Sequence, residues 1–315
     1  MGCCGTCYPP RDPGTGSLPL MPEPVAVVTD STAYLPVGVL ECLGVRVVPL
    51  QVVMAGRALA EDDSTTGAQV AQQLAARAPV TTSRPAPATF VNVYRELAST
   101  GRTTVVSVHL SGELSGTVDA ARIAARQVAD EGTRVTVVDS RSLAMGLGFA
   151  VCTAARLAGA GADAARIALA AARRALAGTT VLCVDTLEFL RRGGRIGTAQ
   201  AVFGSALSVR PILHLADGKL ELLERVRTRS RARARLEEIL VAEAERSLES
   251  GVPVDIAVHH LAAADLAQEM ADRLRERLPD LRELHVQEVG PVIGAHVGPG
   301  MLGGVVSPDA VGCTS

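Results

Sequence analysis

The stretch VAVVTDST, residues 25–32, indicates how this chain begins to fold. Its first five residues are apolar or β-branched, which is typical of a buried strand in a parallel sheet, and a polar run then opens a loop. Residues 103–108 and 135–138 have the same character, and helical patterns lie between the three runs. Strands that alternate with helices predict an α/β domain with a doubly wound, mostly parallel sheet.

Outward from this stretch, residues 36–44 read as a helix, residues 45–53 as a second strand, and the segment from residue 290 to residue 300 as a glycine-rich loop. The second half of the chain carries further strand patterns at residues 181–184, 210–215, 220–226, 254–258 and 284–288. Asp217-Gly218 lies between the runs 210–215 and 220–226, and this dipeptide is typical of a hairpin turn. We therefore expect antiparallel pairing and a mixed α+β domain in this half of the chain. We therefore predict two domains, residues 25–158 and 159–307, between tails at residues 1–24 and 308–315.

The composition excludes several classes of protein. Of the 315 residues, 48% are hydrophobic and 20% are charged, a balance that is typical of packed globular domains. A net charge of -2, aromatic residues at 2% and the lack of tryptophan argue against a nucleic-acid partner. The most apolar stretch, residues 146–170, contains Arg156, Asp163 and Arg166, so no membrane span is expected.

The seven cysteines follow no disulfide framework, which favours a reducing compartment and a cytoplasmic protein. The N-terminal sequence MGCCGT fits a myristoylation template, and Cys4 and Cys7 have the spacing of a metal-ligand pair. Residues 1–24 carry six prolines and four glycines but no periodic apolar pattern, so we read them as an unstructured extension. No second ligand pair lies near Cys4 and Cys7, so we assign no metal site.

Four polar segments are candidates for a functional site. Thr81-Thr82-Ser83 offers adjacent hydroxyls, residues 109–117 join a strand to a helix through Ser111, the glycine-rich segment carries His296, and residues 191–195 hold three arginines. Hydroxyls, helix N-terminal amides and one imidazole make a donor-rich site that suits a carboxylate or phosphate group. The alternative is structural: the hydroxyls cap turns and helices, and the arginines form a solvated helix end.

Two enzyme or small-ligand interpretations stay open at this point. His296 could activate Ser83 or Ser111 in a serine-type acyl-ester hydrolase, although the nucleophile motif G-x-S-x-G is absent from the sequence. A doubly wound domain could instead bind a phosphosugar or nucleotide, but the P-loop motif is also absent. We assign no catalytic residue and no cofactor.

These segments, in their order along the chain, resemble the DegV family of bacterial fatty-acid-binding proteins. The match covers about residues 25–306, and a collinear set of this kind is highly specific. It comprises residues 28–36 (VTDSTAYLP), 82–87 (TSRPAP), 110–117 (LSGELSGT), 139–142 (DSRS), 185–190 (DTLEFL), 193–196 (GGRI), 210–213 (RPIL), 226–228 (VRT) and the segment 290–300.

The resemblance implies that one long-chain fatty acid is enclosed between the two domains. It further implies a non-enzymatic carrier subunit: a separate ATP-dependent fatty acid kinase phosphorylates the bound carboxylate, and an acyltransferase passes the acyl phosphate to phospholipid synthesis. By motif, Thr82 or Ser83, Ser111 and His296 would hold the carboxylate. Arg195 and Arg227 would belong to the surface that meets the kinase.

The chain departs from the common pattern of this family at three positions. Gly112 stands where a second serine is frequent, Tyr34 replaces an acidic residue, and Arg84 replaces a glutamine. These departures concern the preference for a ligand more than the fold.

Overall fold

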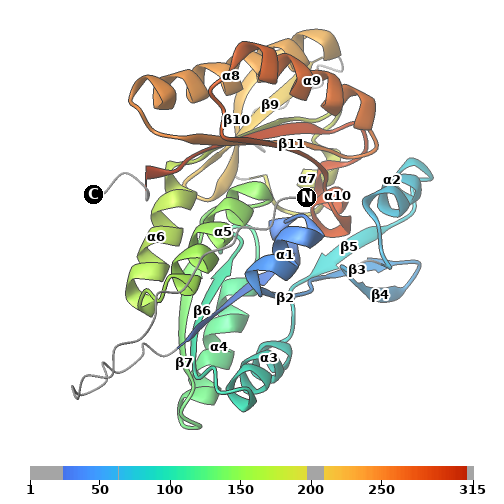
Figure 1. The fold of residues 1–315 in the computed structure, drawn as a ribbon. Helices are drawn as coiled ribbons and strands as arrows, with labels where there is room; N and C mark the ends of the chain where they lie inside the picture. Colours follow the sequence, from blue (N-terminus) through green and yellow to red (C-terminus); the bar gives the residue numbers. More distant parts are fainter. Residues whose placement is uncertain (1–23, 63, 197–208, 311–315) are drawn as a thin grey trace.

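A parallel sheet forms the lower layer of the molecule in Figure 1, and a larger mixed sheet forms the upper layer. The computed structural model describes residues 24–62, 64–196 and 209–310. The lower sheet has the order β2-β1-β6-β7 with every pair parallel, as the alternating pattern predicts. Its strands are β1 (Val25–Asp30), β2 (Arg46–Val48), β6 (Thr104–His109) and β7 (Arg134–Asp139).

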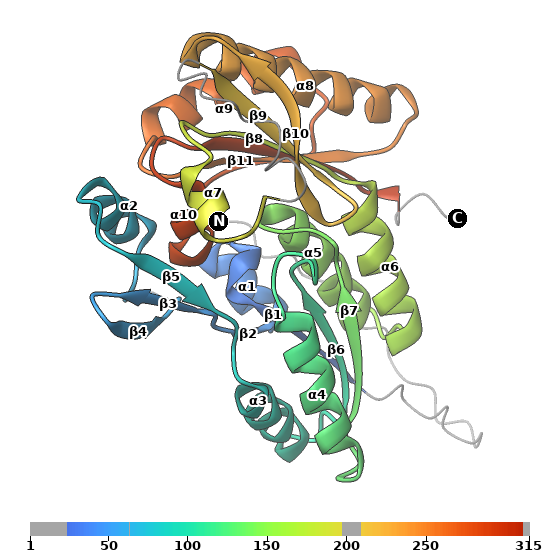
Figure 2. The ribbon, with the colours of Figure 1, turned by 180° about the vertical axis from the view of Figure 1, so that it is seen from behind.

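Helices cover both faces of the lower sheet, which confirms the doubly wound prediction (Figures 1 and 2). Successive residues of a strand point to opposite faces, so Val28 packs with α3 (Pro87–Ser99) and α4 (Thr117–Ala129), whereas Val27 packs with α5 (Met145–Gly159) and α6 (Ala164–Ala177). Helix α6 lies in the range expected for the second domain and contacts α5, β6 and β7 as well as β13 (Leu302–Pro308) of the upper sheet. The division at residues 158 and 159 stays a prediction.

The upper sheet has six strands in the order β10-β9-β8-β13-β11-β12, and only β11 and β12 pair in parallel among them. The expected hairpin is confirmed: Asp217 and Gly218 connect β9 to β10 with φ of 49° and 80°. Helices α8 (Arg229–Glu249) and α9 (Ala264–Arg277) cover its outer face. The strands are β8 (Thr179–Cys183), β9 (Arg210–Ala216), β10 (Lys219–Val226), β11 (Val254–His260), β12 (Glu283–Glu288) and β13 (Leu302–Pro308).

A third, three-stranded antiparallel sheet projects beside the two main layers (Figure 2). It consists of β4 (Arg57–Ala60), β3 (Gln51–Met54) and β5 (Val80–Ser83), with α2 (Gly67–Ala75) following β4. The strand expected over residues 45–53 is therefore two strands in two sheets. Pro49 lies between them, and because proline has no amide hydrogen to donate to a sheet, the chain leaves the lower sheet there.

Four short helices connect these layers: the 3₁₀ helix η1 (Ser31–Ala33), α1 (Val37–Leu43), α7 (Glu188–Arg192) and α10 (Pro291–Val297). The prediction of a loop over residues 290–300 is wrong, because α10 occupies most of it. Pro291 stands at the first position of this helix, where its fixed φ is favourable, and Gly298 ends the helix with φ of 77°.

The chain ends expected as tails are only partly described. Strand β13 extends to Pro308, and Asp309 is buried against the side chain of Arg282. Residues 1–23 and 311–315, with the myristoylation-like sequence and the Cys4 and Cys7 pair, lie outside the described residues. Within the described ranges, no helix is both long and apolar enough to cross a bilayer.

Candidate functional site

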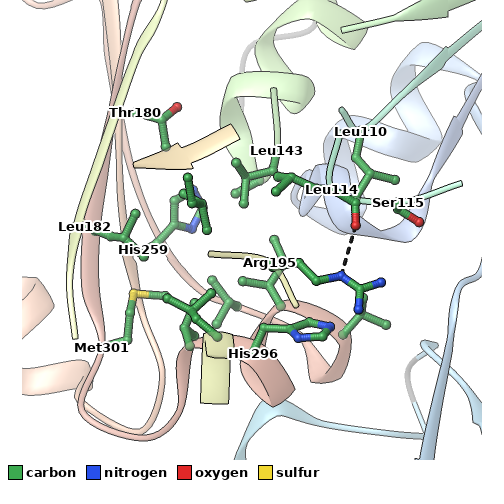
Figure 3. A pocket seen from close by; sticks show the side chains of 18 of the residues that line it. Leu110, Leu114, Ser115, Leu143, Thr180, Leu182, Arg195, His259, His296 and Met301 are labelled. Carbon is green, nitrogen blue, oxygen red and sulfur yellow. Dashed lines mark hydrogen bonds between the residues drawn. The ribbon is translucent and has the colours of Figure 1, made fainter. Parts of the chain in front are cut away.

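An apolar cavity of about 840 Å³, part of it open to solvent, lies between the two main sheets. The inner face of the upper sheet forms one wall, and the ends of α5, α7 and α10, the strand β5 and the loop after β6 form the others. Figure 3 shows Leu182 and His259 on one side of the cavity and Ser115 and Arg195 on the opposite side. Most of the lining is aliphatic: Leu50, Leu110, Leu114, Leu143, Leu182, Leu190, Leu220, Val292, Ile293 and Val297.

Two of the predicted polar residues meet at this cavity. The hydroxyl of Thr82 lies 2.8 Å from Nε2 of His296. Thr82 is placed by β5, where it pairs with Val52 of β3, and His296 lies in the last turn of α10. Either atom can be the donor, because the imidazole tautomer decides which ring nitrogen carries the hydrogen.

His296 is an uncharged imidazole at neutral pH. Burial lowers its pKa to about 4, and the nearby Arg195 guanidinium lowers the pKa further in the same direction. Gly193 lets the end of α7 approach this ring, because a Cβ at that position would collide with Nδ1 of His296. The imidazole can therefore donate or accept one hydrogen bond at the cavity without bringing a charge.

Arg195 lines the cavity beside His296. Its Nε donates to the carbonyl oxygen of Leu114 at 3.1 Å, drawn as a dashed line in Figure 3, and its Nη1 donates to the carbonyl oxygen of Gly193. The predicted role of Arg195 in meeting a kinase stays a prediction, and in the structure the residue also lines the cavity. It supplies positive charge next to the neutral imidazole, which suits an anionic group.

The other three predicted residues have different surroundings. Ser83 borders the cavity, but its hydroxyl donates to Oε1 of Gln51 at 3.2 Å. Ser111 is fully buried, and its hydroxyl donates to the carbonyl oxygen of Gly218 at 2.7 Å in the β9–β10 hairpin. Arg227 is exposed and borders a separate surface hollow near the start of α8. Their predicted roles stay predictions.

Sequence reasoning missed two contributions to the site. Ser115, four residues after Ser111 in the same segment, lines the cavity. The buried Glu61 holds the first turn of α10, because its carboxylate accepts hydrogen bonds from the amide of Val292 at 2.8 Å, the hydroxyl of Tyr34 at 3.0 Å and the hydroxyl of Ser31 at 2.5 Å. The serine segment pointed toward Ser115, whereas no local pattern marks Glu61.

The surroundings of His296 do not support hydrolase chemistry. Its partner is the hydroxyl of Thr82 and its charged neighbour is Arg195, and no carboxylate pairs with it in the described part of the chain. A serine nucleophile needs its own hydrogen bond to the base, whereas the hydroxyls of Ser83 and Ser111 are bonded elsewhere.

A serine, a histidine and an aspartate do meet elsewhere in the lower sheet. Nε2 of His109 lies 2.7 Å from the hydroxyl of Ser107, and Nδ1 lies 3.0 Å from Oδ2 of Asp30. All three residues are 0% exposed, and Tyr94 donates a further hydrogen bond to Ser107. No substrate can reach this chain of hydrogen bonds, so it stabilises the sheet. Among the described residues there is also no group of three or more potential metal ligands.

The fold and the site define the class of this protein. It is an α/β protein in which two sheet layers enclose an apolar cavity, and hydroxyl, imidazole and guanidinium groups lie in one part of the cavity wall. The chain belongs to the DegV family, as its motifs predict: the model described as "Uncharacterised protein, DegV family" matches residues 24–309. A DegV domain-containing protein of Streptomyces coelicolor is 54% identical over 287 residues, which cover 91% of this chain and 99% of that protein.

Solved structures of the same family match in fold. A DegV family protein from Thermus thermophilus, described by its fatty acid binding, has a TM-score of 0.80 and 35% sequence identity over 90% of this chain and 99% of its own. DegV of Bacillus subtilis, described as a fatty acid binding protein, has a TM-score of 0.82 and 31% identity over 91% and 99%. The predicted fold class is therefore confirmed.

Proposed function

We propose that this protein binds one long-chain fatty acid in the cavity between its two main sheets. The observation that carries the proposal is the cavity itself, which is aliphatic along most of its wall and has Thr82, Arg195 and His296 together in one part of it. The two family members described as fatty acid binding proteins support it, because they share the fold over nearly the whole chain.

Burial of the acyl chain would supply the affinity. At roughly 0.8 kcal/mol for each buried CH₂, about 16 carbons give about 12 kcal/mol, before the costs of association and of ordering the chain. A cavity lined by leucine, valine and isoleucine is the environment in which this transfer is favourable.

The carboxylate would lie at the polar part of the wall. In our proposal the Thr82 hydroxyl accepts a hydrogen bond from Nε2–H of His296 and donates its own hydrogen to the carboxylate. Ser83 borders the carboxylate, and Arg195 provides the compensating charge. Ser111 is not among the residues that line the cavity; its hydroxyl holds the loop after β6 to the β9–β10 hairpin and so contributes to stability. Because hydrogen bonds to a charged group are about twice as strong as neutral ones, a few donors suffice to orient the head group.

We further propose that the protein is a non-enzymatic, cytoplasmic carrier. A separate ATP-dependent fatty acid kinase would transfer the terminal phosphoryl group of ATP to a carboxylate oxygen, which yields acyl phosphate and ADP. An acyl phosphate acyltransferase would then use the product for phospholipid synthesis. Arg227, exposed near the start of α8, and Arg195 would meet the kinase.

The test is mass spectrometry of the organic extract from protein purified without denaturant. We expect about one long-chain fatty acid for each chain, and uptake of palmitate or oleate by the delipidated protein. An extract without fatty acid, together with no uptake of either, would overturn the proposal.

The carrier role is tested with ATP, the loaded protein and a bacterial fatty acid kinase, and with hydroxylamine to trap acyl phosphate as a hydroxamate. We expect the hydroxamate only when all three components are present. Formation by the protein and ATP alone would contradict the carrier role.

A further inference from the structure

A second hollow of about 530 Å³, part of it open to solvent and bordered by charged side chains, lies on the outer face of the upper sheet, across the sheet from the apolar cavity. Cys183 and Leu302 line this hollow, whereas their strand neighbours Leu182 and Gly303 line the apolar cavity. Successive strand residues point to opposite faces, so the two sites do not share a wall of side chains. We propose that this hollow binds a phosphate-type dianion.

The hollow collects residues that the fatty acid site does not use, and Asp185, Arg210 and Gly300 among them belong to the family motifs. Asp185 follows β8, Arg210 begins β9, Arg229 begins α8, and Gly300 precedes β13. A Cβ at Gly300 would lie 3.2 Å from Oδ2 of Asp185, and φ of Gly300 is 81°. The chain therefore passes close to the carboxylate at a position that favours glycine.

Asp185 orients two guanidinium groups in the hollow, one through its carboxylate and one mainly through its backbone carbonyl. The side chain of Arg229 donates two hydrogen bonds to the Asp185 carboxylate, from Nε to Oδ1 at 2.9 Å and from Nη2 to Oδ2 at 2.5 Å. Nη1 of Arg210 donates to the carbonyl oxygen of Asp185 at 2.6 Å and lies 3.5 Å from Oδ1. Each guanidinium has five N–H donors, so both retain donors for a ligand in a fixed orientation.

The charges in the hollow do not balance. Arg210, Arg229 and Arg233 contribute three positive charges, and Asp185 contributes one negative charge, which leaves a net charge of +2. Arg233 has no ion pair within the described part of the chain, and it lies one helical turn from Arg229, a spacing at which like charges repel. A bound dianion would neutralise this excess.

Phosphate chemistry fits these donors best. Planar guanidinium groups bind phosphate oxygens through two parallel hydrogen bonds, and a net charge of +2 matches a dianion. The apolar floor of Val184, Leu266 and Leu302 reduces screening by water. The phosphate could be free or could belong to a phosphomonoester, and the same titration distinguishes them.

Calorimetric titration of the full-length protein with inorganic phosphate, at low and constant ionic strength, tests the proposal. We expect saturable binding of one phosphate, weakened at least tenfold in Arg233→Ala. The matched control is Arg231→Ala, which removes the same charge from the same helix at an exposed position that borders a different hollow. We expect the control to bind within twofold of the wild type.

Absence of saturable binding to the wild type would overturn the proposal, and so would equal weakening by both variants. An adenosine monophosphate or sugar phosphate that binds tenfold tighter than inorganic phosphate would identify a phosphomonoester, whereas equal affinities would identify the free ion. The fatty acid content of the same preparations is measured in parallel. A failure of phosphate binding can then be distinguished from a failure of the proposed lipid binding.

Discussion

The Thr82 hydroxyl and Nε2 of His296 lie 2.8 Å apart although 214 positions separate the two residues in the sequence. The contact joins the three-stranded sheet to α10. Glu61, in the loop after β4, holds the other end of α10 through the amide of Val292. The three-stranded sheet layer therefore fixes both ends of the helix that carries His296, and the first three predictions below concern that residue.

Thr82→Val should weaken fatty acid binding about five- to tenfold. The valine keeps the shape of the side chain but removes the hydroxyl, so both the His296 ring and the proposed carboxylate lose a partner, and a net hydrogen bond is worth about 1 kcal/mol. Displacement of a fluorescent fatty acid from the delipidated protein measures the change. Ser83→Ala is the matched control, because that hydroxyl bonds to Gln51, and its affinity should stay within twofold. Equal losses in the two variants would contradict the assignment.

Arg195→Gln should raise the pKa of His296. Burial is the larger cause of the low value and remains in the variant, but the repulsion between the guanidinium and a protonated imidazole is removed. An NMR titration of the imidazole signals measures the shift. Arg192→Gln serves as the control, because Arg192 is exposed and paired with Glu188, and it should leave the His296 signals unchanged. No shift in Arg195→Gln would mean that the guanidinium does not act on the ring.

The free energy of unfolding should fall as the pH falls from about 6.5 to 4. Burial lowers the pKa of both His259 and His296 to about 4, whereas an unfolded histidine has a pKa of about 6.5, so the unfolded chain takes up more protons in this window. Each histidine contributes up to about 3 kcal/mol, which is present above pH 6.5 and lost toward pH 4. Urea unfolding of the wild type and His296→Asn at several pH values measures this. The variant should show a shallower dependence, and an identical slope would refute the interpretation.

Ser111→Ala should lower the free energy of unfolding by about 1–2 kcal/mol while fatty acid affinity stays within twofold. The substitution leaves the buried carbonyl of Gly218 without its partner, and the hydroxyl does not line the cavity. Urea unfolding and the displacement assay separate the two effects. A tenfold loss of affinity at unchanged stability would instead support direct contact between Ser111 and the carboxylate.

Local sequence patterns predicted the fold class and the family. The alternation of buried strands and helices is visible in the residues themselves, and β1, β6 and β7 lie where these runs predict them. Asp217-Gly218 also predicted its hairpin from local sequence. The turn needs residues that tolerate φ above zero, and this tolerance depends on the two turn residues themselves. Neither feature depends on a distant contact.

The three-stranded sheet and α10 could not be predicted in this way. The strands of this sheet and the helix α10 are short, and a short strand or helix forms in water only when tertiary contacts stabilise it. For α10 those contacts include Glu61, Tyr34 and Thr82, none of which is close to it in sequence.

The polar residues of the candidate site were selected from the sequence as a set, but only the folded chain sorted them. Thr82, Arg195 and His296 come together at the cavity, Ser111 turns to the hairpin, and Arg227 lies at the surface. A motif specifies which donors are present. The direction of each side chain depends on strand register and on the packing of elements that are distant in the sequence, so the partner of each donor is decided by the tertiary structure.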